Sequence, residues 1–551
     1  MGDWWRGSVT YQIYPRSFQD SNGDGIGDLP GITRRLDYVA DLGVDAIWLS
    51  PIFPSPMADM GYDVSDYTDI DPQFGTLADF DAMVARAHEL GLKVIIDQVL
   101  SHSSSEHPFF KQSRQSRTDP KADWYVWADP KHDGSPPNNW LSVFGGSAWQ
   151  WESRRFQYYL HNFLVEQPDF NFHKAEVQDW LLSTMRFWLD RGVDGFRLDT
   201  VNFYFHDKLL RDDPPDFRKK ERPDWNPYLM QYHIFSKNQP ENLQFLERMR
   251  ALLDEYEARA LVGEMGEAHH AIRMMGEYTT GKRLHKCYSF EMLEEAFSAA
   301  HFRRSIEEFF AGAPGGWPTW AFSNHDVPRH ASRWARHGIS HDALVKLTGA
   351  LLLSLEGSMC VYQGEELGQT ETDLEYHELT DPQGLRFWPE NKGRDGCRTP
   401  MAWDASEPNA GFTTARPWLP VKAPQAARAV ATQTGRADSV LEFYRRMLKL
   451  RRETEELRTG RSVFFDTSEP VLAFTRGGKV LCVFNLSPER HEVRLAGGGE
   501  MAVAEGAEHR NDGLVLHPNG FAIMEVVGTV EVTDTPGKPP ARPAKNRPAS
   551  K

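Results

Sequence analysis

Several features are scarce or missing in this chain of 551 residues, and each absence excludes a class of protein. The longest apolar stretch, at 351–355, is broken by Glu356 well short of a membrane span. The N-terminal residues lack the basic start and the apolar core of a signal peptide, so we expect a cytoplasmic protein. The four cysteines have neither metal-ligand spacing nor a dense disulfide pattern, which excludes a zinc finger or a disulfide-stapled domain.

Acidic residues outnumber basic ones: the chain has 78 Asp and Glu and 62 Lys and Arg, which gives a net charge of −16. A nucleic-acid partner needs a basic surface that releases counterions, so we exclude one. The length suggests roughly three or four structural units, and no internal repeat of fixed period is present. We expect a monomer or a homodimer that acts on a small molecule and not on a membrane.

What is present is a set of carboxylates, each at the end of a strand-like segment: Asp199, Glu264 and Asp326. The C-terminal ends of the strands of a parallel barrel converge on one mouth, so these residues can meet there. Two or three carboxylates at one site are suited to cleaving a glycosidic bond. Taken singly, a strand-end Asp is more often a helix cap or a turn former. The three together, in their local contexts, favour a catalytic site.

Short β-rich runs alternate with amphipathic helical stretches over the first 450 residues or so, which is the pattern of a parallel sheet. Gly91 and Gly192 stand where helices at 79–90 and 176–191 are expected to end in a left-handed cap. Eight strand-like runs predict a (β/α)8 TIM barrel. They span 9–14, 44–50, 93–100, 193–198, 260–264, 287–290, 320–324 and 359–363.

About seventy residues rich in Ser, Pro, Asn, Trp and Asp separate the third strand from the next helix. A structureless loop of that length is unusual in a compact domain, so we predict an inserted domain at 103–172 between barrel parts at 1–102 and 173–460. The tail at 534–551, rich in Pro, Ala, Lys and Arg, is expected to be disordered. Short alternating strands predict a C-terminal antiparallel β-sandwich at 461–533, with strands at 471–475, 479–485, 491–495, 513–517 and 521–526.

The local sequences at the strand ends resemble signature regions of the α-amylase family (glycoside hydrolase family 13). They are GFRLD at 195–199, GE at 263–264 and NHD at 324–326, with DQVLSH at 97–102 as a fourth. The segments QPDFN at 167–171 and YQGEE at 362–366 are typical of its oligo-1,6-glucosidase and α-glucosidase branch. The resemblance implies the same barrel, with the inserted domain B forming one wall of the substrate pocket.

The resemblance implies that Asp199 is the nucleophile, Glu264 the general acid/base and Asp326 the carboxylate that stabilises the transition state. One ionised carboxylate would attack the anomeric carbon while a protonated carboxyl serves the leaving oxygen, with a covalent glycosyl-enzyme and net retention. Arg197 shares a strand face with Asp199 and is expected to keep that carboxylate ionised. The reaction also requires a raised pKa at Glu264.

The same resemblance implies a closed glucose pocket, and hence an exo-acting α-glucosidase. Asp63 and Arg398 would close the pocket and bind the 4-hydroxyl of the terminal glucose, on which Tyr62 would stack. The alternative for Asp63 and Arg398 is a surface ion pair of little energetic worth. His102 and His325 would donate hydrogen bonds to sugar hydroxyls. Further substrate contacts are expected from Phe144, Phe163, Gln167, Arg197, Thr200 and Arg329.

Thr200, directly after the predicted nucleophile, bears on linkage preference. Oligo-1,6-glucosidases of this branch usually carry Val at the matching position, whereas members that prefer α-1,4 bonds carry Thr or Ala. We therefore expect a preference for α-1,4 bonds, as in maltose. The alternative is that Thr200 is simply a β-branched strand residue.

The run DSNGDGIGD at 20–28 places oxygen ligands at alternate positions, as in the first part of an EF-hand loop. An EF-hand would have Glu where Gly31 stands, and such a run is often only an Asx-rich turn. The resemblance implies a structural Ca²⁺ or Mg²⁺ ion, and no organic cofactor is expected. Ser101 replaces the family's Asn before His102, so we expect no second ion beside domain B. The implied ligands are Asp20, Asn22, Asp24, Asp28 and the carbonyl of Ile26.

Two other functions stay open at this point. A transglucosylase, sucrose isomerase or trehalose synthase would share the fold and pass the glucosyl group to a sugar, although 327–330 (VPRH) differs from the Arg-Leu-Asp-Arg type loop of sucrose isomerases. A non-catalytic transporter heavy chain also shares the fold, but it needs a membrane anchor and has no reason to keep three carboxylates. The residues 265–267 (MGE) differ from many relatives, and maltose, sucrose, an aryl glucoside and a longer oligomer stay unranked as substrates.

Overall fold

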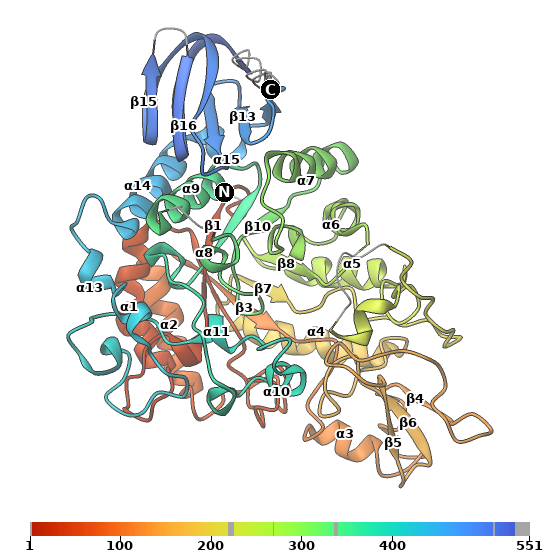
Figure 1. Cartoon of the computed structure of the whole chain (residues 1–551). Helices are drawn as coiled ribbons and strands as arrows, with labels where there is room; N and C mark the ends of the chain where they lie inside the picture. Colours follow the sequence, from red (N-terminus) through yellow and green to blue (C-terminus); the bar gives the residue numbers. More distant parts are fainter. Residues whose placement is uncertain (1–2, 219–224, 268, 336–339, 511–512, 535–551) are drawn as a thin grey trace, which may run out of the picture.

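The computed structural model describes residues 3–218, 225–267, 269–335, 340–510 and 513–534. Among them, eight parallel strands form one sheet in the order β10-β11-β1-β2-β3-β7-β8-β9. A parallel bridge between Cys287 and Pro318 joins the two edges of this sheet and closes it. The predicted (β/α)8 barrel is therefore confirmed (Figure 1). The predicted disordered tail lies, beyond Asp534, outside the described residues.

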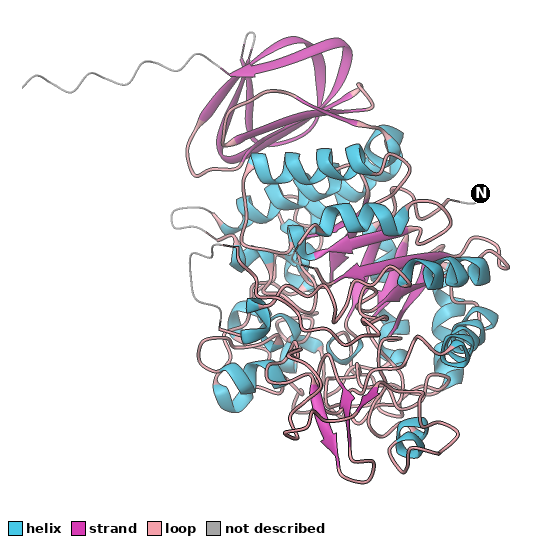
Figure 2. Ribbon diagram, turned by 90° about the vertical axis from the view of Figure 1, so that its right-hand side faces the viewer, coloured by secondary structure: helices cyan, strands magenta, loops and turns pink. Residues whose placement is uncertain are grey.

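The barrel strands are short and almost entirely buried, and long helices surround them (Figure 2). The strands are β1 (Val9–Ile13), β2 (Ala46–Leu49), β3 (Lys93–Gln98), β7 (Gly195–Leu198), β8 (Ala260–Met265), β9 (Lys286–Ser289), β10 (Thr319–Ala321) and β11 (Ser358–Tyr362). The long helices are α1 (Leu29–Leu42), α2 (Leu77–Glu89), α4 (Ala175–Asp190), α5 (Asn242–Leu253), α6 (Ala271–Thr279), α7 (Ala299–Gly312), α9 (His341–Ser354) and α14 (Val440–Glu453). Gly91 and Gly192, after α2 and α4, have positive φ angles of 78° and 92°, as predicted for helix ends.

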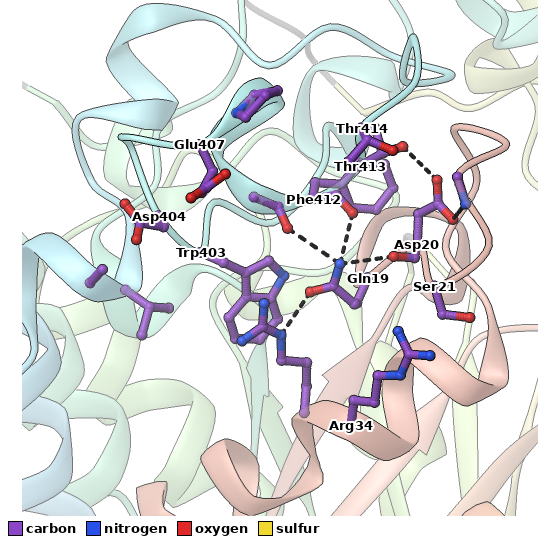
Figure 3. A pocket seen from close by; sticks show the side chains of 16 residues that line it. Gln19, Asp20, Ser21, Arg34, Trp403, Asp404, Glu407, Phe412, Thr413 and Thr414 are labelled. Carbon is purple, nitrogen blue, oxygen red and sulfur yellow. Dashed lines mark hydrogen bonds between the residues drawn. The ribbon is translucent and has the colours of Figure 1, made fainter.

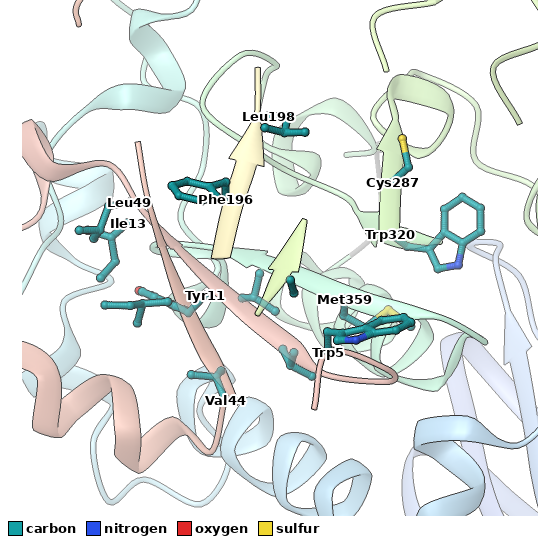
Figure 4. Close-up of a cluster of buried hydrophobic side chains, with 14 of the residues drawn as sticks. Trp5, Tyr11, Ile13, Val44, Leu49, Phe196, Leu198, Cys287, Trp320 and Met359 are labelled. Atoms are coloured by element: carbon teal, nitrogen blue, oxygen red, sulfur yellow. The ribbon is translucent and has the colours of Figure 1, made fainter. Parts of the chain in front are cut away.

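Alternation along each strand decides which side chains reach the inside of the barrel, because successive residues point to opposite faces. Outward-facing Tyr11, Ile13 and Phe196 belong to the large apolar core beneath the helices (Figure 4). Inward-facing Arg197 and its neighbours instead carry polar groups toward the C-terminal ends of the strands. This division separates the part of the core that stabilises the fold from the part that performs chemistry.

Deep in the barrel, Lys286 of β9 lines a cavity of about 20 Å³ together with Thr10 and Thr319. Lys286 is fully buried, and its ammonium donates a hydrogen bond to the hydroxyl of Ser8 at 3.2 Å. The Thr10 and Thr319 hydroxyls are buried without a hydrogen-bond partner. A cavity of this size with several polar groups in its wall has room for one water molecule. Burial lowers the pKa of Lys286 to about 8.

An inserted unit follows the third barrel strand, as predicted. In the described residues it contains α3 (Pro108–Ser113) and a three-stranded antiparallel sheet of β4 (Trp127–Ala128), β5 (Trp149–Glu152) and β6 (Gln157–Leu160). An isolated bridge between His102 and Asp169 ties its beginning to its end. The unit lies at the opposite end of the molecule from the C-terminal sheet (Figures 1 and 2). The boundaries at 103 and 172 stay a prediction.

The C-terminal region is an antiparallel sheet that folds on itself. Within the described residues its strands are β12 (Ser462–Phe464), β13 (Val471–Arg476), β14 (Val480–Asn485), β15 (His491–Arg510) and β16 (Gly513–Asp534). Leu516 of β16 pairs with both His491 and Ala507 of β15, so the long strands curl around a small apolar core. The strands predicted at 513–517 and 521–526 are one bent strand, because Asn519, with a φ of 53°, bends the chain without ending it.

No helix among the described residues is both long and apolar enough to cross a membrane.

Candidate active site

The strand-end carboxylates Asp199 and Glu264 meet on one guanidinium, that of Arg197. Nη1 of Arg197 lies 2.7 Å from Oδ1 of Asp199, and Nη2 lies 2.5 Å from Oε1 of Glu264. All three side chains are buried. β7 and β8 are adjacent parallel strands, so their C-terminal ends bring the two carboxyl groups to the same place. The structure therefore brings together the two carboxyl groups that the sequence predicts to react.

Two further residues, on strands β3 and β9, hold Arg197. Asp97 of β3 accepts from Nη1 at 2.8 Å, and the hydroxyl of Tyr288 of β9 accepts from Nη2 at 2.9 Å. That hydroxyl in turn donates to Oε1 of Glu264 at 3.0 Å. Arg197 thus lies beneath the carboxylates as a fixed cation and is not in the wall of the pocket. The predicted contact of Arg197 with Asp199 is found, but its predicted contact with substrate is corrected, because the guanidinium lies outside the pocket lining.

The pKa values of the two carboxyl groups are shifted in the same direction. Burial raises the pKa of Glu264 to about 7, against the effect of Arg197 and with the help of Asp199. Burial also raises the pKa of Asp199 to about 7, and again Arg197 opposes the shift. Two interacting carboxyls near pH 7 titrate as a pair, so they can hold one proton between them. One ionised and one protonated carboxyl is the state that glycoside hydrolysis needs.

Asp326 is held from the opposite side by two arginines. Its Oδ1 lies 2.9 Å from Nη2 of Arg398 and 3.3 Å from Nη1 of Arg394, and its Oδ2 lies 3.3 Å from Nε2 of His325. Burial works against ionisation, but His325 and the two arginines hold the pKa of Asp326 well below its usual range. Asp326 is therefore an anion at neutral pH, where Asp199 and Glu264 titrate.

A pocket of about 350 Å³ opens above these carboxylates. Its closed end is formed by Asp59 and Arg394, whose Oδ1 and Nη2 are 2.7 Å apart. The prediction of Asp63 and Arg398 at this place is wrong. Asp63 turns away and accepts from the Ser55 hydroxyl at 2.9 Å and from the amide of Ala58.

In both cases the predicted residue lies in the correct motif but four positions after the residue that lines the pocket. Asp59 and Asp63 flank the same Gly-Tyr pair, and Arg394 and Arg398 lie on one short segment. Each motif thus contains two charged residues of the same sign. The sequence carries no signal that tells which of the two points into the pocket, although it does identify the segment.

Tyr62 and His102 lie in the pocket wall as predicted. The Tyr62 ring stacks on His325, with centroids 5.4 Å apart and planes 8° from parallel. His325 itself lies behind Tyr62, and its ring nitrogens contact the Tyr62 hydroxyl and Gln12. The prediction that His325 donates to a sugar hydroxyl is therefore corrected to a role behind the wall. Burial lowers the pKa of His102 to about 4, so this imidazole is neutral.

The inserted unit supplies one side of the pocket through Phe144, Phe163 and Gln167, as predicted. The amide of Gln167 donates to Oδ2 of Asp59 at 3.2 Å and so fixes the closed end. The predicted substrate contact of Arg329 is wrong. Its guanidinium donates to the backbone carbonyls of Gln363 and Cys397 behind the pocket.

The other end of the pocket is open and belongs to the loops after β7 and β8. Thr200 has a φ of 42°, an unfavourable conformation for a β-branched residue and one that occurs at functional sites. Its amide donates to Oε2 of Glu264 at 3.1 Å, and its hydroxyl contacts Oδ2 of Asp199 at 3.3 Å. Phe203, Tyr228, Leu229, Lys237, Gly266 and Glu267 also line this end, and the sequence assigned none of them to the pocket. Other parts of the chain supply three more lining residues: Phe290 and Glu294 after β9, and Gln383 of α10 (Pro382–Phe387).

The 20–28 loop has oxygen-rich geometry but no preformed cluster of acids. Oδ1 of Asp20 accepts from the amides of Asn22 and Gly23, and Oδ2 accepts from the Thr413 hydroxyl at the edge of a cavity of about 580 Å³ (Figure 3). Asp28 caps α1 through the amide of Gly31. Among the described residues, no three His, Cys, Asp or Glu side chains are grouped to hold a metal ion. The donors are nonetheless hard oxygens, the ligand type that Ca²⁺ and Mg²⁺ prefer.

Comparison with known proteins agrees with this geometry. The family model of the α-amylase catalytic domain matches residues 12–460. A probable α-glucosidase of Rhizobium meliloti is 57% identical over 88% of this chain and 90% of its own length. An oligo-1,6-glucosidase of Heyndrickxia coagulans is 37% identical over 88% of this chain and 93% of its own. The crystal structure of the α-glucosyl transfer enzyme XgtA has 54% identity and a TM-score of 0.92, over 96% of this chain and all of that one.

Proposed function

Because this chain belongs to the α-amylase family and is a glycoside hydrolase of the α-glucosidase class, we propose that it releases terminal glucose from short α-glucosides with retention of configuration. The observation that carries the proposal is the pair Asp199 and Glu264 on the two nitrogens of one arginine, at the foot of a pocket closed at one end. Asp199 would attack the anomeric carbon while Glu264 protonates the leaving oxygen.

The second half of the reaction uses the same groups in reverse. Glu264, now ionised, would take a proton from water, and the water oxygen would attack the anomeric carbon and release Asp199. Asp326 would stabilise the positive charge that develops on the glucosyl ring in both steps. Its low pKa supports this role, because only an anion can do so.

The closed end supports exo-action. Asp59 is buried, Arg394 is 10% exposed, and the two are paired, so a sugar chain cannot pass them without breaking the pair. Only the terminal glucose would then reach the carboxylates. Thr200 supports a preference for α-1,4 bonds, since its hydroxyl and amide contact both reacting carboxyl groups.

The decisive experiment is product analysis over maltose, isomaltose, sucrose, an aryl α-glucoside and maltotetraose. We expect each substrate to lose only its non-reducing terminal glucose, with the remaining sugar or alcohol as the second product. NMR before mutarotation should show this glucose as the α-anomer. Release of internal fragments from maltotetraose would rule out exo-action, and release of β-glucose would rule out retention. No turnover of any of the five would reject the proposed function.

Transfer to an acceptor is the second candidate activity. It is favoured by the likeness to the α-glucosyl transfer enzyme XgtA, and by the open end, where Phe203 and Leu229 offer apolar surface beside Glu267. Such an activity would use the same glycosyl-enzyme and exchange water for another hydroxyl. Raising the concentration of an alcohol acceptor while measuring free glucose and new glucoside separates the two activities.

The proposed ion is structural and takes no part in the reaction. Asp20, Asn22, Asp24, Asp28 and the carbonyl of Ile26 would hold Ca²⁺ or Mg²⁺ and supply positive charge to a loop that carries three carboxylates. Ion binding that favours the folded state raises the unfolding temperature. We expect EDTA to lower Tm, Ca²⁺ or Mg²⁺ to restore it, and Asp20→Ala to remove the response. No metal by elemental analysis after saturation and desalting would reject the site.

A further inference from the structure

Arg398 lies behind the pocket and acts on a carboxylate there, not on the sugar. It is fully buried and is not in the pocket wall. Nη2 donates to Oδ1 of Asp326 at 2.9 Å, and Nε donates to the backbone carbonyl of His325 at 2.7 Å. These two bonds fix both the Asp326 side chain and the backbone that precedes it. The other oxygen of Asp326, Oδ2, lies 3.3 Å from Nε2 of His325.

The segment that carries Arg398 is a single helical turn, α11 (Asp395–Arg398), which cannot hold its own position. The last carbonyls of a helix lack partners within the helix and must find others. The carbonyl of Cys397 accepts from the Tyr362 hydroxyl at 3.0 Å and from Arg329 at 3.1 Å. The carbonyl of Arg398 accepts from the hydroxyl of Ser17. Side chains of the barrel thus cap this turn from below.

Ser17 is itself clamped on both sides. It is fully buried in the short helix η1 (Pro15–Ser17), directly after β1. Its hydroxyl, while donating to Arg398, accepts from Nε1 of Trp418 at 3.0 Å. Its carbonyl accepts from the amide of Met401 at 2.7 Å. The chain on the far side of Arg398 is therefore pinned to the same serine as Arg398 itself.

The residue before η1 extends this support. The Tyr14 ring packs against the His325 ring with centroids 5.7 Å apart, and the Arg398 guanidinium lies 5.5 Å from the centre of the same ring. The end of β1 therefore contacts, within four residues, both neighbours of Asp326. A small displacement of this end would move the carboxylate, because packed interiors transmit strain.

We propose that Arg398 and Ser17 are positioning residues that hold Asp326 in its productive orientation, with Ser17 acting through Arg398. The inference rests on the proposed function, in which Asp326 stabilises the glucosyl transition state. A carboxylate that rocks by about an ångström loses much of the benefit of preorganisation, and a misplacement of that size can cost about 10²-fold in rate.

The test is a double-mutant cycle on the full chain with Ser17→Ala, Arg398→Gln and the double variant. kcat and KM are measured for maltose and for an aryl α-glucoside, and Tm is measured for each protein. We expect Arg398→Gln to lower kcat about 10²-fold and Ser17→Ala about tenfold, with smaller changes in KM. The double variant should be no slower than Arg398→Gln, because the hydroxyl acts only through the arginine.

A matched control is Ser305→Ala, which removes a buried serine hydroxyl that donates to a carbonyl, that of His301 at 2.9 Å, in the outer helix α7. It should lower Tm as much as Ser17→Ala does and leave kcat unchanged. If Ser17→Ala fails to fold, Trp418→Phe, which removes the bond to the Ser17 hydroxyl, takes its place.

The outcomes separate the two levels of the inference. Losses that multiply in the double variant, or a kcat for Ser17→Ala equal to that of the Ser305→Ala control, overturn the role of Ser17. An unchanged kcat in Arg398→Gln overturns the whole positioning proposal while the enzyme remains a glucosidase. A wild type that releases no glucose from any α-glucoside removes the proposed function, and the positioning role with it.

Discussion

The two ends of the active-site pocket differ in the kinds of side chain that form them. The closed end is a buried network of ions, in which Arg394 lies 2.7 Å from Asp59 and 2.6 Å from Asp381. The open end comes from loops and mixes apolar and polar side chains, with Phe203 and Leu229 in its wall beside Lys237 and Glu267. Buried charges with several fixed partners tolerate one geometry, whereas apolar surface accepts many shapes.

This difference indicates which end binds the glucose unit and which end distinguishes one substrate from another. The closed end would bind the glucose unit that every substrate shares, so a substitution there should lower kcat/KM equally for all substrates. The open end would contact the leaving group, which differs between substrates, so a substitution there should change their relative kcat/KM values. Asp199 and Glu264 lie where the two ends meet.

The largest effect is expected at this meeting point. Asp199→Asn should lower kcat roughly 10⁴-fold or more on every substrate, because an amide cannot form the glycosyl ester. Circular dichroism and Tm check that the fold is intact. A folded variant with near-normal turnover would show that Asp199 is not the nucleophile. The reaction would then not take place where the two ends of the pocket meet.

A change at the closed end should be the next largest. Arg394→Ala leaves Asp59 and Asp381 as uncompensated buried charges and should lower kcat/KM roughly 10² to 10³-fold. The loss should be the same, within a factor of about three, for maltose and an aryl α-glucoside. The exposed Arg186→Ala, which separates a surface pair with Glu255, is the control and should change nothing. Strongly different losses on the two substrates would contradict the division of labour.

A change at the open end should be smaller and selective. Thr200→Val removes the hydroxyl near Asp199 and should raise activity on isomaltose relative to maltose by roughly tenfold to a hundredfold. The measurement is kcat/KM for both disaccharides on both proteins. A ratio that does not move, or equal efficiency of the wild type on both sugars, would place linkage choice elsewhere in the open end.

The pH dependence is the mildest probe. The pKa values of Asp199 and Glu264 are both raised to about 7, so kcat/KM should fall below neutral pH as Asp199 takes a proton and fall above it as Glu264 loses one. The result is a bell centred near pH 7 for every substrate, since both groups lie outside the variable end. In Glu264→Gln the fall above pH 7 should disappear on substrates with good leaving groups. A profile that stays flat from pH 5 to 9 would contradict the assignment.

Much of this architecture was predictable from the sequence, because it depends on local patterns. The alternation of strand and helix identified the barrel, and short motifs at strand ends identified Asp199, Glu264 and Asp326. What failed depends on the direction of side chains in three dimensions. The sequence predicts Asp63 for the pocket, but Asp59 flanks the same turn, and only the packed loop decides which carboxylate faces Arg394.

The open end was out of reach for a related reason. Its lining residues, such as Tyr228 and Lys237, lie in a long segment after β7 without periodicity, and nothing in their spacing brings them to the pocket. Arg329 failed differently: it follows a catalytic motif, but backbone carbonyls of Gln363 and Cys397 satisfy its guanidinium. Unpaired carbonyls of a folded chain leave no trace in its sequence.

The buried Lys286 lowers the free energy of unfolding, so replacing it is a route to a more stable protein. With a pKa of about 8 in the folded protein and 10.5 as its ordinary value, the ammonium destabilises the native state fully below pH 8. The cost fades between those two values, as the folded protein sheds a proton that the unfolded chain retains. At neutral pH it is about 3 kcal/mol, a large share of the 5–15 kcal/mol by which a typical domain is stable. A methionine at this position would keep the shape, shed the charge and leave every residue of the pocket wall unchanged, and so offers a more heat-resistant enzyme. Arg197 and Tyr288 line the same small cavity, so kcat is the measurement that checks whether they keep their places.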